Sequence, residues 1–147
     1  MKKWQIFIIF LLASYIVFMS MKHHQPEYFS INGITYQVRV VNGFTSNSAL
    51  PLVIWCTSQD GDIIGGRALQ EGDDLAWDAT LSFWTTSNPA FTCTMKWDRT
   101  RKKFDAFRVH QDGTKCGNLR KCSWLVKEDG FYFSNDEFNW VKDFSWS

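Results

Sequence analysis

The sequence is poor in histidine, and its cysteines are not spaced for metal binding. Its three histidines are His23, His24 and His110, and the first two lie in an amino-terminal stretch where a frayed segment is expected. No histidine is therefore an evident partner for a nucleophilic thiol. The four cysteines are separated by 36, 22 and 5 residues, without the close Cys-x-x-Cys or Cys/His pairs of zinc sites. These absences argue against thiol catalysis and against structural zinc.

The chain also lacks an excess of positive charge and a complete calcium loop. It carries 16 basic and 15 acidic side chains, and removal of a leader containing Lys2 and Lys3 would leave 14 against 15. A near-neutral domain argues against a polyanion partner such as nucleic acid, whose binding proteins are usually basic. Asp60 and Asp62 lack the further acids and the closing Glu of a calcium loop. We expect no metal and no cofactor.

The amino terminus has the layout of a secretory signal peptide. Lys2 and Lys3 precede an apolar block over residues 6–19, and at about fourteen residues this block is shorter than the roughly twenty that span a bilayer. We predict a signal peptide over residues 1–20, a secreted extracellular protein, and no membrane insertion after cleavage. The bulky Phe18, three positions before the cut, leaves an uncleaved anchor as the alternative.

Residues 30–147 fit one domain with one core, and most of them alternate between apolar and polar side chains. This period-two pattern is typical of strands that bury one face. The clearest examples are "TYQVRVV", "LAWDATLSF" and "FTCTMKW", whereas "PLVIWC" is apolar on both faces, as in a central strand. No segment has a convincing helical period. The pattern predicts an all-β fold, either a sandwich or a barrel; of these we expect a small disulfide-stapled antiparallel β-sandwich.

Two hairpins are predicted. In "WLVKEDGFYF" a type I′ turn at Asp129 and Gly130 would pair Val126 with Phe133, placing Trp124, Val126, Phe131 and Phe133 on one buried face. A second hairpin spans Met95–Val109, with the basic run "DRTRKK" at its tip. The Gly- and Asp-rich segment after Cys56 predicts turns around one short edge strand.

The four cysteines of an exported chain are interpreted first as two disulfides. Alternation places Cys56 and Cys93 on inward faces, so a bond between them would tie two strands across the core, as inter-sheet disulfides do. We favour Cys56–Cys93 with Cys116–Cys122, and the two crossed pairings remain alternatives.

These segments together resemble the plant self-incompatibility S-protein homologue family. The similarity covers residues 36–140, and its most specific part joins Cys122, Trp124, Val126 and the Glu-Asp-Gly turn. The other matching segments are "VRVVNGF", "PLVIWCTSQDGDIIGGRAL", "LAWDATLSF", "FTCTMKWD" and "KFDAF".

The resemblance implies a secreted β-sandwich with two disulfides and no catalytic activity, which acts as a ligand for a cell-surface receptor. Two departures from the family pattern stand out. Trp55 precedes the first cysteine, where the family often has a polar residue. The chain also lacks an N-glycosylation sequon, since Asn47 is followed by Ser48 and Ala49, which argues against sugar-dependent recognition.

A ligand of this kind needs a rigid scaffold with exposed loops, and we expect it to be a monomer. The candidate loops span residues 57–66, 85–90, 98–102 and 111–121. Trp84, beside one of them, is of the residue type that anchors interfaces, although packing in the core or at its rim is the interpretation that we favour for this side chain. The candidate contact residues are Gln59, Asp60, Asp62, Trp84, Asn88, Arg99, Arg101, Lys102, Asn118 and Arg120.

Two other functions are weighed against this one. A glycan hydrolase would use two carboxylates, such as Asp60 with Asp62 or Asp73 with Asp78, but acids in turns and on wet strand faces are ordinarily solvated. A carbohydrate-binding or inhibitor module would present tryptophans outside the core, and alternation leaves Trp55, Trp84, Trp140 and Trp146 as candidates.

Overall fold

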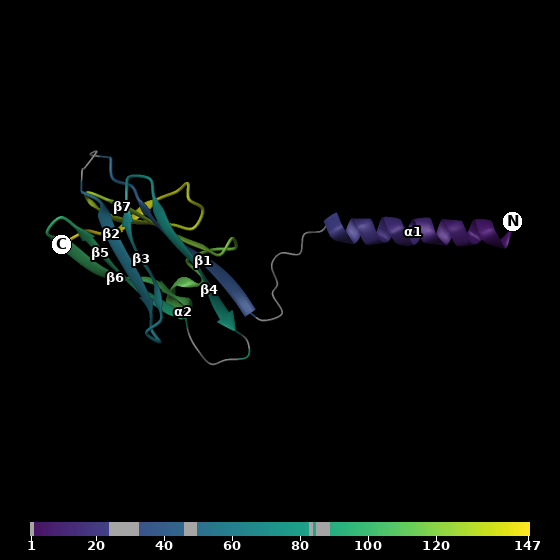
Figure 1. Ribbon diagram of the computed structural model, residues 1–147, viewed down its shortest axis with the longest axis horizontal. Coiled ribbons are helices and arrows are strands. Elements are labelled where there is room, and N and C mark those ends of the chain that lie inside the picture. Colours follow the sequence, from purple (N-terminus) through teal and green to yellow (C-terminus); the bar gives the residue numbers. More distant parts are fainter. Residues whose placement is uncertain (1, 24–32, 46–49, 83, 85–88) are drawn as a thin grey trace.

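A computed structural model describes residues 2–23, 33–45, 50–82, 84 and 89–147. Most of the chain after residue 32 forms strands (Figure 1). In order, the elements are α1 (Lys3–His23), β1 (Gly33–Asn42), β2 (Leu52–Ser58), β3 (Ile63–Leu69), β4 (Asp74–Ser82), β5 (Ala90–Trp97), β6 (Thr100–Arg108), α2 (Val109–Asp112), β7 (Lys121–Lys127), β8 (Gly130–Ser134) and β9 (Val141–Phe144).

The strands form two sheets that pack face to face, which confirms the predicted β-sandwich. The five-stranded sheet has the order β4-β1-β7-β8-β9, and the four-stranded sheet has the order β3-β2-β5-β6. One pairing differs from the antiparallel expectation, because β1 runs parallel to β7 with Val38 opposite Cys122. Alternation determines which face of a strand is buried but not which strand lies beside it, so the sequence pattern did not contain this pairing.

The core lies between the two sheets and is formed by the residues that alternation assigned to inward faces. Val38 and Val40 of β1, Ala79 of β4, and Cys93 and Met95 of β5 are all fully or almost fully buried. The indole Nε1 of Trp124 donates a hydrogen bond to the carbonyl of Ala106 at 2.9 Å, so this buried ring also satisfies its polar group. The predicted central strand, β2, and the predicted edge strand, β3, occupy those positions.

The β7–β8 hairpin forms, but its turn lies one residue earlier than predicted. Val126 pairs with Phe131 and Lys127 with Gly130, so the turn residues are Glu128 and Asp129, and neither has a positive φ. Gly130 instead opens β8 at φ +151, where a Cβ atom would lie 2.5 Å from the carbonyl oxygen of Phe144. The glycine is thus required by the close approach of β9 and not by a type I′ turn. The same side chains still face the core, because the observed register differs from the predicted one by two residues and residues two apart on a strand share a face.

The two disulfides are Cys56–Cys93 and Cys116–Cys122, as favoured from the sequence. The prediction that Cys56–Cys93 crosses between sheets is wrong, since these residues face each other on the adjacent strands β2 and β5. The sheets are held together by apolar packing instead. Both cysteines still point into the core, where they are fully buried.

The β5–β6 hairpin is confirmed, with a tight turn at Asp98 and Arg99. The expectation that the domain has no helix needs one correction, because Val109–Asp112 forms the short helix α2. His110 therefore lies on a helical turn and not in a loop, although its side chain is exposed as expected. In Figure 1, α2 lies at the end of the sandwich where β4 ends; we call this the α2 end.

The leader forms the helix α1, whose side chains are exposed from Lys2 to Ser20. Residues 3–20 are long and apolar enough to cross a membrane by length and composition. A signal sequence near an amino terminus meets the same criterion.

Candidate partner-binding surface

Connections from both sheets meet at the α2 end. The turn after β2 is joined to the start of β5 by a hydrogen bond from the N–H of Gln59 to the carbonyl of Ala90 at 2.8 Å. The first residue of α2 is joined to the same segment by the N–H of Val109, which donates to the carbonyl of Pro89 at 3.2 Å. Backbone bonds of this kind place residues distant in sequence on one continuous surface.

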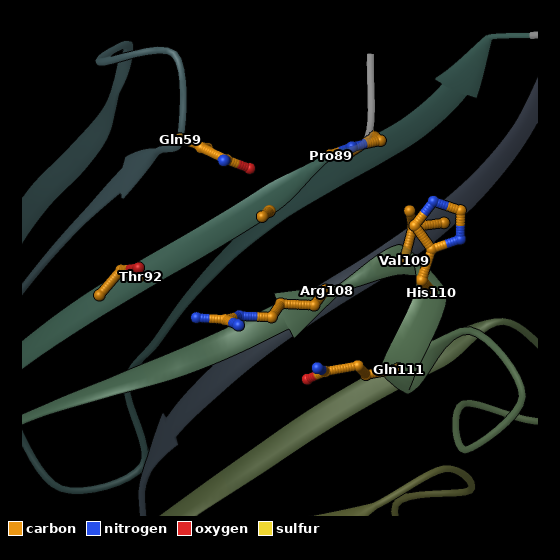
Figure 2. A pocket seen from close by; sticks show the side chains of 8 residues that line it. Gln59, Pro89, Thr92, Arg108, Val109, His110 and Gln111 are labelled. Carbon is orange, nitrogen blue, oxygen red and sulfur yellow. The ribbon is translucent and has the colours of Figure 1, made fainter. Parts of the chain in front are cut away.

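These connections border an open recess of about 380 Å³ (Figure 2). Its volume is near the lower limit of ligand pockets. Figure 2 shows Arg108 and Gln111 extending in the same direction, while His110 points away from them. The guanidinium of Arg108 is held by the carboxylate of Asp105 at 2.7 Å. The lining residues are Gln59, Pro89, Ala90, Thr92, Arg108, Val109, His110 and Gln111.

The segment after α2 is fixed by the Cys116–Cys122 disulfide and by its own backbone. The carboxylate of Asp112 accepts a hydrogen bond from the N–H of Arg108 at 2.7 Å, and its carbonyl accepts one from the N–H of Cys116 at 2.9 Å. Arg120 has a φ of 53°, and its carbonyl accepts from the N–H of Gln37 at 2.8 Å. The segment is therefore pre-organised, which lowers the entropic cost of binding.

The connection between β8 and β9, residues 135–140, is organised by one carboxylate. Asp136 accepts hydrogen bonds from the N–H groups of Phe138 at 2.9 Å and Asn139 at 2.8 Å, from the Asn139 amide at 2.7 Å and from the Ser134 hydroxyl at 2.8 Å. The backbone bonds of Asn139 and Phe138, followed by those two side chains, hold the pKa of Asp136 well below its usual value. The loop presents the ring of Phe138, which is 88% exposed.

Glu137, in the same loop, forms side-chain hydrogen bonds with the five-stranded sheet and so anchors the loop to it. Its φ is 63°, and its carboxylate accepts hydrogen bonds from Arg39 at 3.1 Å and from the Ser123 hydroxyl at 3.0 Å. Burial opposes ionisation of Glu137, but these two bonds outweigh it and lower its pKa. Arg39 is also paired with Asp74, so it lies between two carboxylates.

A family model described as plant self-incompatibility protein S1 matches residues 37–146. The chain belongs to this S1 family. No curated protein and no solved structure matches it. The matched range begins at residue 37 within β1 and ends after β9, so it includes most of β1, every other strand of both sheets and all the connections between β2 and β9.

Most of the candidate contact residues of this S1-family protein lie at the α2 end. Gln59, Asp60 and Asp62 are exposed in the β2–β3 turn, and Asn118 and Arg120 follow the buried Cys116. Trp84, just after β4, is 79% exposed and is not a core residue. Asn88 lies outside the described residues.

The three basic candidates lie elsewhere. Arg99 is in the β5–β6 turn, at the opposite end of the sandwich, whereas Arg101 and Lys102 belong to the strand β6. The predicted loop over residues 98–102 is therefore shorter than expected. Arg101 lies over the ring of Trp55 and Lys102 over the ring of Phe144, at 5.4 and 5.5 Å from the ring centroids. Two of the three basic side chains, Arg101 and Lys102, therefore contact aromatic rings.

The loop over residues 135–140 was not among the predicted loops. Ser134, Asp136 and Asn139 are turn-forming residue types around a single exposed phenylalanine, and this was the available signal. What the sequence did not indicate is the contact of Glu137 with Arg39, nearly a hundred residues earlier in the chain.

The acidic pairs considered for a hydrolase do not have the required separation or setting. Asp73 and Asp78 are five residues apart along β4 and its approach, which places them about 16 Å apart at the rise of an extended strand. Glycosidase carboxylates lie roughly 5–9.5 Å apart. Asp60 and Asp62 are exposed in a tight turn, and they border an open recess together with the exposed Asp78. Among the residues that the structure describes, no cluster of three metal-binding side chains occurs.

Proposed function

We propose that this S1-family protein is a secreted, non-catalytic ligand, and that a cell-surface receptor recognises it through the α2 end. The observation that carries the proposal is the distribution of exposed apolar side chains. In the described part of the sandwich six large apolar residues are exposed, and five of them belong to the connections or strand ends at the α2 end. They are Ile63, Trp84, Leu119, Phe138 and Val141, and the sixth, Leu50, lies at the opposite end.

Exposed aromatic side chains in a rigid setting are typical anchors of protein interfaces. Phe138 is presented by a loop that Asp136 and Glu137 hold in place. The neighbouring segment is connected to that loop by the Asn135 amide, which donates to the carbonyl of Lys115 at 3.2 Å. A receptor would therefore meet a preformed surface and would lose little entropy in ordering it.

Family membership and this geometry support the proposed role as a ligand and the proposed absence of catalysis. Asp73 and Asp78 are too far apart for a glycosidase pair, and Asp60, Asp62 and Asp78, which border one open recess, are exposed, as solvated carboxylates ordinarily are. The amino-terminal apolar helix and the two disulfides support export, since disulfides persist in oxidising compartments. We extend the proposal to domain organisation, with a leader over residues 1–20 and a monomeric sandwich over residues 30–147.

The test compares two single substitutions that each remove one exposed apolar side chain. Labelled protein, secreted in its oxidised form, is titrated onto intact cells of the source plant, and saturable binding is measured against an excess of unlabelled protein. We expect Phe138→Ser to weaken saturable binding at least tenfold, because hot-spot truncations cost about 2 kcal/mol or more. Leu50→Ser, at the opposite end, should bind as the unmodified protein does. Equal binding by both variants would contradict the assignment of the α2 end.

A further inference from the structure

The outer face of the four-stranded sheet carries a tryptophan beside several cations. Trp55 on β2 lies opposite Thr94 on β5, which lies opposite Lys103 on β6. Two residues farther along these strands, Lys96 of β5 lies opposite Arg101 of β6. Residues paired across neighbouring strands share a face, so these five side chains all project away from the core. We call this surface the Trp55 face.

The cations of the Trp55 face lack acidic partners among the described residues, whereas Asp105 on the same face has two partners. Lys96, Arg101 and Lys103 are exposed, and none of them forms an ion pair with a described residue. Asp105, on the same face, pairs with Arg108 at 2.7 Å and accepts a hydrogen bond from the Thr92 hydroxyl at 3.3 Å. The face therefore carries three uncompensated positive charges.

The outer face of the other sheet is different in this respect. Its arginine, Arg39, is paired with Asp74 on one side and with Glu137 on the other, and Lys142 is paired with Asp129. Only Lys121 and Lys127 of this face form no ion pair with a described residue. The near-neutral charge of the whole domain thus conceals a local excess of positive charge on the Trp55 face. A local basic surface attracts anions whatever the net charge of the chain.

Trp55 has the setting of a stacking residue and not of a core residue. Its side chain is half-buried, and the guanidinium of Arg101 lies 5.4 Å from its ring centroid. On the neighbouring edge strand β3 the residue opposite Trp55 is Gly66. Because glycine has no side chain, β3 places no side chain directly opposite the indole. The adjacent Ala68 is small and exposed. The indole is therefore partly exposed on the outer face, beside Gly66 and Ala68 of the edge strand.

We propose that the Trp55 face binds an acidic polysaccharide, whose uronate carboxylates pair with Lys96, Arg101 and Lys103 while a sugar ring packs against Trp55. A strand-built face suits an extended polymer better than a small molecule, which takes a concave site. Threonine hydroxyls beside the ring, such as that of Thr94, both donate and accept hydrogen bonds and so match sugar hydroxyls. This inference goes beyond the proposed receptor function, because the Trp55 face contains none of the five exposed apolar residues at the α2 end.

The test measures binding of the oxidised secreted protein to immobilised polygalacturonate. We expect binding that weakens as NaCl is raised from about 0.05 M to about 0.5 M, since exposed charges are screened over that range. Combined Lys96→Gln, Arg101→Gln and Lys103→Gln should lower the affinity at least tenfold, and Trp55→Ala at least threefold. The methyl-esterified polymer, which has the same sugar backbone without the charge, should bind much more weakly.

A matched control removes three cations from the other sheet, with Lys121→Gln, Lys127→Gln and Lys142→Gln combined. This variant should bind polygalacturonate within about twofold of the unmodified protein. An equal loss in both triple variants, full binding by Trp55→Ala, or equal binding of the esterified polymer would overturn the proposal. Tighter binding to an acidic peptide of equal charge than to polygalacturonate would overturn it as well. Non-reducing electrophoresis and near-ultraviolet circular dichroism confirm that each variant keeps its disulfides and core.

Discussion

At the scale of single residues, Asp136 shows how one side chain orders the backbone that follows it. Its carboxylate accepts hydrogen bonds from the N–H groups of Phe138 and Asn139, in the manner of an Asx turn. We predict that Asp136→Ala releases these two amides and leaves the sandwich folded. Amide hydrogen exchange should show lost protection at residues 138 and 139, whereas Asp60→Asn, which changes an exposed acid in another turn, should not alter it.

The low pKa of Asp136 determines how this order depends on pH. The bonds from Asn139 and Phe138 favour the charged carboxylate, so its pKa in the folded protein lies below the unfolded value of about 3.9. The stabilisation is therefore present above about pH 4 and is lost as the pH falls through the folded pKa. A carboxyl-carbon titration should place the Asp136 midpoint clearly below the unfolded value of about 3.9. A midpoint at or above 3.9 would show that the hydrogen bonds do not hold the carboxylate.

At the scale of strands and connections, the two disulfides act on loops of very different length. Cys56 and Cys93 are 37 residues apart and Cys116 and Cys122 are 6 apart, and the chain-entropy relation assigns about 4 and about 2 kcal/mol to such loops. We predict that replacing the first pair by alanine lowers the free energy of unfolding more than replacing the second. Urea unfolding of the two double variants measures this difference. Equal losses would show that strand packing, and not loop closure, dominates.

The short disulfide should matter more for recognition than for stability. Cys116→Ala with Cys122→Ala leaves the β2–β5 cross-link intact but frees the segment that follows α2 at the α2 end. Receptor binding should therefore weaken in a variant whose sandwich remains folded at 25 °C. The same variant should keep its affinity for polygalacturonate, because the Trp55 face lies on the other sheet.

Much of each strand could be predicted from the sequence, because alternation reports directly which side chains are buried. Val38, Met95 and Trp124 all face the core as expected. The pairing partners could not be predicted in the same way: the parallel contact of β1 with β7 and the neighbouring positions of Cys56 and Cys93 depend on the path of the whole chain. The β7–β8 turn lies one residue earlier than predicted, because Gly130 is required by the close approach of β9 and not by the turn. The local sequence pattern contains no information on β9, which lies farther along the chain.

At the scale of the whole molecule, the candidate site was only partly accessible to sequence reasoning. The loops after β2 and α2 were predicted from turn-forming residues, but which loops share an end depends on strand direction. Arg99 was therefore grouped with residues at the opposite end. The net charge of the chain likewise did not indicate the Trp55 face. It is a sum that does not distinguish Arg39, which is paired with two carboxylates, from Lys96, Arg101 and Lys103, which form no ion pair with a described residue. Both the α2 end and the Trp55 face arise when the two sheets are assembled.

Cleavage of the leader determines whether the sandwich is released from the cell or remains tethered to its membrane. Residues 3–20 form part of α1 and are apolar enough either to be a signal sequence or to span a membrane. We expect cleavage after Ser20, so mass spectrometry of protein from the medium should identify Met21 as the first residue. Leu11→Arg should abolish export, because a charge at the centre of the apolar block opposes its insertion into the membrane. Recovery of the full chain from carbonate-washed membranes would instead show a tethered protein, whose α2 end and Trp55 face would act at the surface of the producing cell.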